Sequence, residues 1–168
     1  GYFIGATRPG YGFSLKTFLL VLACMVFARS AAMGFNRWAD MYFDSLNPRT
    51  AVREIPSGKI TPRQALLFVT VSSLLFILSA ALLNKLTFIL SPVALIIVLG
   101  YSYTKRFTPL CHLVLGLGLS LAPIGAYLAV TGSFALLPLL YSFIVLTWVS
   151  GFDIIYSLQD DQFDRDTG

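Results

Sequence analysis

Charged residues are scarce in this sequence of 168 residues, because only 12% are Asp, Glu, Lys or Arg. An ordinary soluble domain contains about twice that share. Three stretches contain no charged residue at all: 64–84, 86–104 and 107–152. A hydrocarbon core about 30 Å thick requires about 20 apolar residues per helix. We therefore expect these stretches to form one, one and two membrane-spanning helices, which excludes a soluble fold.

Cysteines are also few and a basic stripe is absent, which argues against a disulfide-stabilised protein and a nucleic-acid-binding protein. The two cysteines, Cys24 and Cys111, do not indicate a disulfide framework. The net charge is +4, yet no basic stripe with interleaved aromatic residues is present, so we expect no nucleic-acid partner. Lys and Arg instead lie mainly in short loops between the apolar stretches, where they orient a membrane protein.

The apolar stretches predict an all-α fold, a polytopic transmembrane helix bundle. We interpret residues 1–6 as the tail of a helix that begins earlier. Residues 1–168 are then expected to form a single transmembrane domain that is truncated at both ends. Five full spans are expected, with approximate bounds Ser14–Trp38, Thr61–Leu83, Leu86–Tyr103, Pro109–Val130 and Phe134 through Trp148 into the acidic segment Asp153–Asp164.

The basic residues predict how the bundle is oriented. Each span reverses the direction of the chain, so successive loops alternate between the two sides of the membrane. Arg8, Lys16 and Lys85 fall on one side. Lys and Arg are enriched in cytoplasmic loops, so we expect the opposite, richer side to face the cytoplasm. The eight residues predicted on that side are Arg37, Arg49, Arg53, Lys59, Arg63, Lys105, Arg106 and Arg165.

The first acidic cluster lies at the cytoplasmic end of the first full span. Asn36, Asp40 and Asp44 follow one another at four-residue spacing. At about 100° per residue, Arg29, Asn36 and Asp40 lie within about 40° of one helix face, and Asp44 is about 60° from Arg29. A charge inside a span costs about 2.5–3.5 kcal/mol or more and is usually functional. Snorkelling of Arg29, or a structural pair with Asp40, is the alternative.

The second acidic cluster follows the last predicted span. Asp153, Asp160 and Asp164 share a helix face, with Tyr156 one turn along. Two helices would then each present a ladder of oxygen ligands, which suits Mg²⁺ together with substrate phosphates. Helix ends solvated at the headgroups would also contain Asp residues. That explanation is weaker for two ladders with matching spacing than for a single Asp.

At these residues the sequence resembles the UbiA superfamily of intramembrane prenyltransferases. The match consists of Asn36-x-x-x-Asp40-x-x-x-Asp44 and Asp160-x-x-x-Asp164, and the segments 47–50 and 101–108 fit the same family. Within the family, the chain looks most like 4-hydroxybenzoate polyprenyltransferases, including their relatives in the futalosine route to menaquinone. The resemblance implies a bundle of about nine spanning helices around a cavity that opens sideways to the bilayer. Helices suit a bilayer because each helix pairs its own backbone hydrogen-bonding groups.

The resemblance also implies a reaction. It is the Mg²⁺-dependent transfer of a polyprenyl group from a polyprenyl diphosphate to an aromatic acid, such as 4-hydroxybenzoate, in quinone biosynthesis. The protein would be a multi-pass enzyme of a bacterial inner or plasma membrane, with its active site facing the cytoplasm. One Mg²⁺ would be held by Asn36, Asp40 and Asp44, and a second by Asp160 and Asp164.

Four more residues have catalytic roles in this interpretation. Arg29, Lys105 and Arg106 would stabilise the charge of the leaving diphosphate. Tyr156 would shield the allylic carbocation through the face of its ring. Lys105 and Arg106 would also fit a purely topological role. His112 is the only histidine, and both a packing or interfacial role and a role as a base stay open.

Other classes of membrane protein are alternatives. A cation transporter would contain intramembrane acids, but at midspan on broken helices, whereas these acids lie at one membrane face. A purely structural Asp-rich membrane subunit is a further alternative. A membrane CDP-alcohol phosphotransferase would require a D-G-x-x-A-R run, which this sequence lacks.

Overall fold

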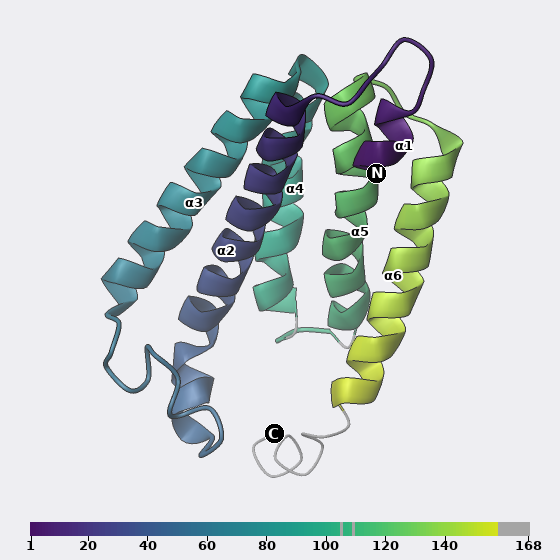
Figure 1. Cartoon of the computed structure of the whole chain (residues 1–168). Helices are drawn as coiled ribbons and strands as arrows, with labels where there is room; N and C mark the ends of the chain where they lie inside the picture. Colours follow the sequence, from purple (N-terminus) through teal and green to yellow (C-terminus); the bar gives the residue numbers. More distant parts are fainter. Residues whose placement is uncertain (105, 109, 158–168) are drawn as a thin grey trace.

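The computed structural model describes residues 1–104, 106–108 and 110–157, and within them the chain forms helices and no strands (Figure 1). Five of the helices are long and apolar enough to cross a membrane. The prediction of an all-α transmembrane bundle is therefore confirmed. The helices are α1 (Tyr2–Ala6), α2 (Leu15–Leu46), α3 (Pro62–Leu83), α4 (Lys85–Thr104), α5 (Cys111–Thr131) and α6 (Leu136–Ser157).

The helix starts and stops follow from local chemistry. At the start of α3, the Thr61 side chain accepts from the backbone N–H of Gln64, and the Gln64 side chain accepts from the N–H of Thr61. This reciprocal cap satisfies two backbone donors that the first helical turn leaves free. At the end of α5, Gly132 adopts φ of 63°, and its N–H donates to the Leu128 carbonyl at 2.8 Å. Glycine adopts this left-handed backbone without a Cβ clash.

Helix α2 is longer than the predicted span, which ended near Trp38. It continues without interruption to Leu46 and contains 32 residues, a length of about 48 Å. A hydrocarbon core of about 30 Å accommodates only about 20 of these residues. The last turns of α2 therefore extend beyond the core, and they contain the first acidic cluster.

The five long helices pack as neighbours in a bundle. Helix α2 contacts α3 and α4, α5 contacts α4 and α6, and the short α1 packs against α5 (Figure 1). Helices α5 and α6 pack closely at Gly116, where a Cβ atom would lie 2.2 Å from Ser150 Oγ. Small residues allow such close helix contacts in membranes.

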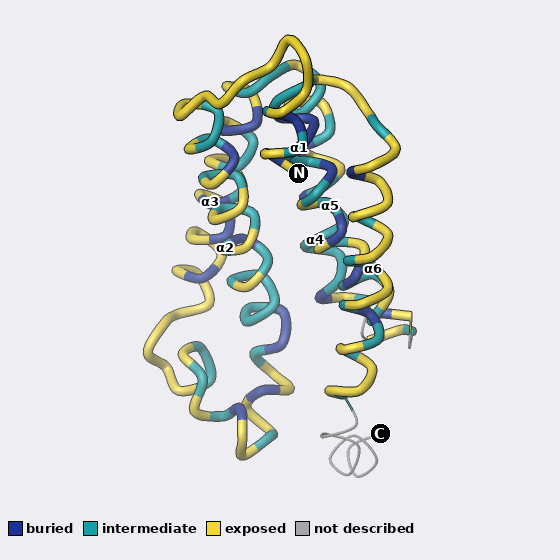
Figure 2. Tube along the Cα trace, turned by 45° about the vertical axis from the view of Figure 1, so that its right-hand side comes forward, coloured by how far each residue is buried: buried dark blue, intermediate teal, exposed yellow. Residues whose placement is uncertain are grey.

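The outer surface of the bundle is apolar. Much of the outward-facing surface of α6 is exposed (Figure 2), and Trp148 is 75% exposed and Ile155 69% exposed. Lipid tails are as apolar as these side chains, so such a surface suits a bilayer. With five spanning helices, the chain is a multi-pass membrane protein.

The alternation of helix direction gathers the polar residues at two ends. We name the acidic end the one that contains the C-terminal ends of α2, α4 and α6, which is the lower end in Figure 1. Arg8, Lys16 and Lys85 belong to the opposite end, as the loop count predicted. Lys105 and Arg165 lie outside the described residues. The basic residues that the structure describes toward the acidic end are Arg37, Arg49, Arg53, Lys59, Arg63 and Arg106.

Candidate functional site

The centre of the candidate site is a pair of buried carboxylates on the last turns of α2. Asp40 is 7% exposed and Asp44 is 6% exposed. They are one helical turn apart, and Asn36, one turn earlier, is half-buried. Burying a charged group is costly unless it is paired or binds a cation. This burial distinguishes the pair from carboxylates that merely end a helix in water.

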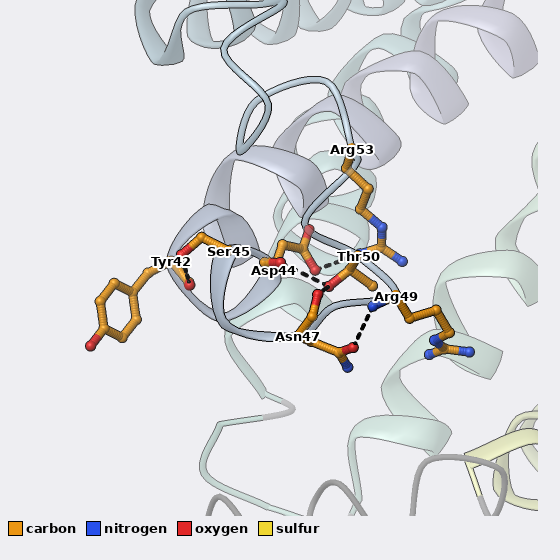
Figure 3. Close-up of polar contacts among 7 residues, drawn as sticks. All are labelled: Tyr42, Asp44, Ser45, Asn47, Arg49, Thr50 and Arg53. Atoms are coloured by element: carbon orange, nitrogen blue, oxygen red, sulfur yellow. Dashed lines mark hydrogen bonds and ion pairs between the residues drawn. The ribbon is translucent and has the colours of Figure 1, made fainter.

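The loop after α2 folds back over Asp44 (Figure 3). One carboxylate oxygen, Oδ1, accepts from the Arg53 guanidinium at 2.6 Å. The Thr50 hydroxyl donates to the backbone carbonyl of Asp44 at 3.0 Å, and Asn47 Oδ1 accepts from the Arg49 N–H at 2.9 Å. The other carboxylate oxygen, Oδ2, is buried and has no hydrogen-bond partner among the described residues. Asp44 is thus held in place with one oxygen still able to accept a ligand.

Arg106 packs beside the carboxylate pair. Its guanidinium donates to the Ala39 carbonyl and lies 5.3 Å from the centre of the Phe43 ring and 5.6 Å from that of Tyr103. These contacts join the end of α4 to α2. An open cavity of about 440 Å³ adjoins them, and its lining is Trp38, Ala39, Met41, Tyr42, Phe43, Tyr103 and Arg106.

A second polar pair connects α5 and α6 at the same end. His112 Nδ1 lies 2.8 Å from Asp153 Oδ2, and the two side chains are 21% and 24% exposed. Tyr101 is in the last turn of α4, at the same end. Residues of α2, α4, α5 and α6 therefore converge at the acidic end, although they are far apart in the sequence.

The remaining predicted site residues differ in their exposure and in their contacts. Arg29 is exposed on α2 and forms no ion pair or hydrogen bond with the residues that the structure describes. The alternative of a structural pair with Asp40 is therefore not found. Tyr156 is 51% exposed and its ring stacks on Phe152, with 6.2 Å between ring centres. Lys105, Asp160 and Asp164 lie outside the described residues.

Among the described residues, no group of three His, Cys, Asp or Glu side chains gathers to form a metal site by itself. The donor set of the first cluster nevertheless fits Mg²⁺. Carboxylate oxygens are the hard ligands that Mg²⁺ prefers, and it binds through one or two of them plus substrate phosphates. Asp44 Oδ2 supplies a buried oxygen of this kind.

Two side-chain pairs in the structure were not predicted from the sequence: Asp44 with Arg53, and His112 with Asp153. A signal existed for the second pair. His112 is near the start of one span and Asp153 near the end of the next, and consecutive antiparallel spans bring such positions to the same end. No comparable periodicity points to Arg53, because it lies in an irregular loop.

The fold and the site together define a class of protein, an α-helical membrane bundle with a polar, carboxylate-containing site at one end. A sequence model described as "UbiA prenyltransferase family" matches residues 2–168, and the chain belongs to this family. The apo structure of a UbiA homolog from Aeropyrum pernix K1 is 40% identical, with a TM-score of 0.87. That similarity covers 98% of this chain and 62% of the solved chain.

Curated relatives are similar over most of this chain. A 4-hydroxybenzoate octaprenyltransferase of Aeromonas salmonicida (strain A449) is 33% identical over 92% of this chain and 53% of its own length. The protein of the same name from Tolumonas auensis is 35% identical over 89% of this chain and 53% of its own length. The chain thus spans about half the length of the curated relatives it matches.

Proposed function

We propose that this protein transfers a polyprenyl group from a polyprenyl diphosphate to an aromatic acid of the 4-hydroxybenzoate type, in a reaction that depends on Mg²⁺. The observation that carries the proposal is the buried carboxylate pair, Asp40 and Asp44, on a UbiA fold. The relatives named 4-hydroxybenzoate octaprenyltransferase support the classes of donor and acceptor. They favour this function over the cation-transporter alternative.

In this proposal Asn36, Asp40 and Asp44 hold one Mg²⁺, and Asp160 and Asp164 hold a second. When bound, the ions would neutralise charge that develops on the departing diphosphate. The ion pair with Arg53 fixes the rotation of the Asp44 carboxylate before any ligand arrives. Such support raises the affinity of a metal site, because less order has to be created on binding.

The cationic residues have a separate task. Arg29, Lys105 and Arg106 supply positive charge to the diphosphate as the allylic C–O bond breaks. A guanidinium has five N–H donors, so the bond from Arg106 to Ala39 leaves donors for a phosphate oxygen. Tyr156 would shield the allylic cation with the ring face that does not stack on Phe152. Its exposure leaves the ring able to reach a substrate.

The proposed orientation follows from the basic loops. The acidic end faces the cytoplasm, where the water-soluble aromatic acid is available, and the polyprenyl tail lies among the apolar helices. The aromatic carbon then attacks the cation, and the ring loses a proton to restore its aromaticity.

The proposal is tested with the full-length protein in isolated membranes, a labelled polyprenyl diphosphate and 4-hydroxybenzoate. We expect prenyl transfer that EDTA abolishes and Mg²⁺ restores. Asp40→Asn should lower the rate by more than about 100-fold, because even residues that only support metal ligands contribute 10–100-fold. Glu54→Gln is the matched control, since Glu54 is an exposed acid in the loop after α2. Equal rates in Asp40→Asn and Glu54→Gln would contradict the metal assignment.

A further inference from the structure

The His112–Asp153 pair is a built arrangement that the proposed metal and diphosphate roles do not use. The two residues come from different helices, and their side chains are only 2.8 Å apart. Both are about three-quarters buried, so water does not surround the contact. The pair lies at the acidic end, because His112 is in the first turn of α5 and Asp153 is near the C-terminal end of α6. It therefore belongs to the same polar region as the carboxylates of α2.

The 2.8 Å contact orients the imidazole ring through Nδ1 and leaves Nε2 outside the pair. With its hydrogen on Nδ1, His112 donates to the Asp153 carboxylate and presents the lone pair of Nε2 as an acceptor. The carboxylate also stabilises the imidazolium that forms when Nε2 takes up a proton. The same division of labour, an acceptor oriented by a third group, is found in catalytic sites where histidine acts as a base.

The proposed reaction requires such an acceptor. The ring carbon forms a bond to the first carbon of the prenyl chain, and the bond between that carbon and the diphosphate oxygen breaks, so diphosphate leaves with the electron pair. The ring then has one hydrogen too many at the attacked carbon. Its C–H electron pair must return to the ring while a base removes the proton.

Few other described groups at the acidic end suit this task. Arg53 and Arg106 have no lone pair to accept a proton. Asp40 and Asp44 are assigned to the metal, which competes with protons for the same oxygens. Tyr101 is a hydroxyl without charge at neutral pH. A histidine oriented by a carboxylate matches the operating range of a general base better than any of these.

We propose that His112, oriented by Asp153, is the base that accepts the ring proton of the aromatic substrate at Nε2. This inference rests on the proposed function and adds a residue to it. The resulting imidazolium is paired with Asp153 and passes the proton to water after the product leaves.

The test uses the full-length protein in membranes and an aromatic acid with deuterium at the carbon that is prenylated. His112→Gln preserves a hydrogen-bond donor for Asp153 but cannot take up the proton. We expect its kcat to fall by about 100-fold, the lower range for loss of a general base. The KM for the prenyl diphosphate should not change. Because proton loss then becomes slow, a normal deuterium isotope effect should be larger in the variant than in the unchanged protein.

A second variant keeps the inference falsifiable if His112→Gln does not fold. Asp153→Asn keeps the imidazole but removes the charge that stabilises the imidazolium. We expect a smaller loss of kcat together with the same rise in the isotope effect. A purely structural clamp between α5 and α6 would lower stability without raising the isotope effect.

The outcomes separate the two proposals. If the unchanged protein transfers prenyl groups and both variants show its isotope effect, His112 is not the base, whereas the proposed function stands. A loss of rate with no rise in the isotope effect also overturns the assignment. If the unchanged protein transfers no prenyl group to any aromatic acid, the proposed function fails, and the inference fails with it.

Discussion

The two ends of the bundle use polar side chains in different ways. At the end opposite the acidic end, polar side chains donate to backbone carbonyls in the last turn of α5. The Asn84 amide donates to the Leu128 carbonyl at 2.8 Å, and the Tyr11 hydroxyl donates to the Thr131 carbonyl at 3.0 Å. These bonds connect segments that are distant in the sequence. The polar groups of this end therefore stabilise the contacts between the helices and their connecting loops.

At the acidic end, polar side chains pair with one another, and some of their atoms can still accept or donate a hydrogen bond. Asp44 pairs with Arg53 and His112 with Asp153. Asp44 Oδ2 and the buried hydroxyl of Ser102 have no hydrogen-bond partner among the described residues. Each buried polar group without a partner costs about 1–3 kcal/mol. The comparison teaches that polar side chains at one end connect backbone segments, whereas the other end retains a buried carboxylate oxygen that a ligand can satisfy.

The largest effect should come from breaking the helix contact that supports the acidic end. In Gly116→Ala the new Cβ would lie 2.2 Å from Ser150 Oγ and 2.7 Å from the backbone carbonyl oxygen of Leu146. The hydroxyl can rotate, but the carbonyl cannot, so α5 and α6 must separate. Overpacking of this kind costs about 1–3 kcal/mol, and we expect a value near 3. The thermal unfolding midpoint in detergent measures the loss.

Gly125→Ala is the matched control on the same helix. A Cβ at Gly125 meets no heavy atom within 4 Å. Alanine also has a higher helix propensity than glycine by about 1 kcal/mol, so stability should stay the same or rise. Equal destabilisation by the two substitutions would contradict the close packing of α5 against α6.

The second prediction concerns Arg53, whose guanidinium holds the Asp44 carboxylate. Arg53→Met keeps the length of the side chain but not its charge, so the Asp44 carboxylate loses its oriented partner. Loss of such support typically lowers metal affinity by about 10–100-fold. Titration of the full-length protein with Mn²⁺, followed by the signal of the bound ion without substrate, measures the change. Lys59→Gln, an exposed residue of the same loop, should leave the affinity unchanged, and an equal loss in both variants would refute the role of Arg53.

Much of the fold is predictable because it follows from local patterns. Charge-free stretches long enough for lipid identify four of the five spans, and the Thr61-Pro62 start agrees with the cap that the structure contains. The extra turns of α2 were not predicted as part of the first span. Beyond Trp38 polar residues interrupt the apolar stretch, and hydropathy does not reveal a helix that continues into the headgroup region.

The site was predictable only where it depends on one helix. Four-residue spacing brings Asn36, Asp40 and Asp44 to one face, and the helix through Leu46 agrees with that arrangement. The burial of these acids depends on packing against other elements. The partners of Asp44 and Asp153 were not predictable for the same reason, since no local pattern encodes a contact between distant segments. The metal and catalytic assignments themselves stay predictions.

The third prediction tests the stabilising end. Asn84→Ala removes the bonds from its amide to the Leu128 and Ala129 carbonyls and the bond that its Oδ1 accepts from the Thr87 N–H at 3.0 Å. Loss of a capping side chain costs about 0.5–2 kcal/mol. We expect a lower unfolding midpoint, whereas kcat per folded molecule should stay unchanged. Ser133→Ala, an exposed position near this end, is the control. A loss of kcat without a loss of stability would show that this end also serves the reaction.

The smallest effect should come from Tyr11→Phe, which removes one exposed hydrogen bond between the loop before α2 and the end of α5. Water can replace this bond, so the net cost should be near the lower limit of about 0.5 kcal/mol. The unfolding midpoint should fall slightly, and prenyl transfer should not change. A double variant with Asn84→Ala sharpens the comparison, because both residues bond to the last turn of α5. If the two losses add, each bond stabilises this end independently. A combined loss well below the sum would mean that the end of α5 depends on the two bonds as one cooperative cap, because either single substitution would already disrupt it.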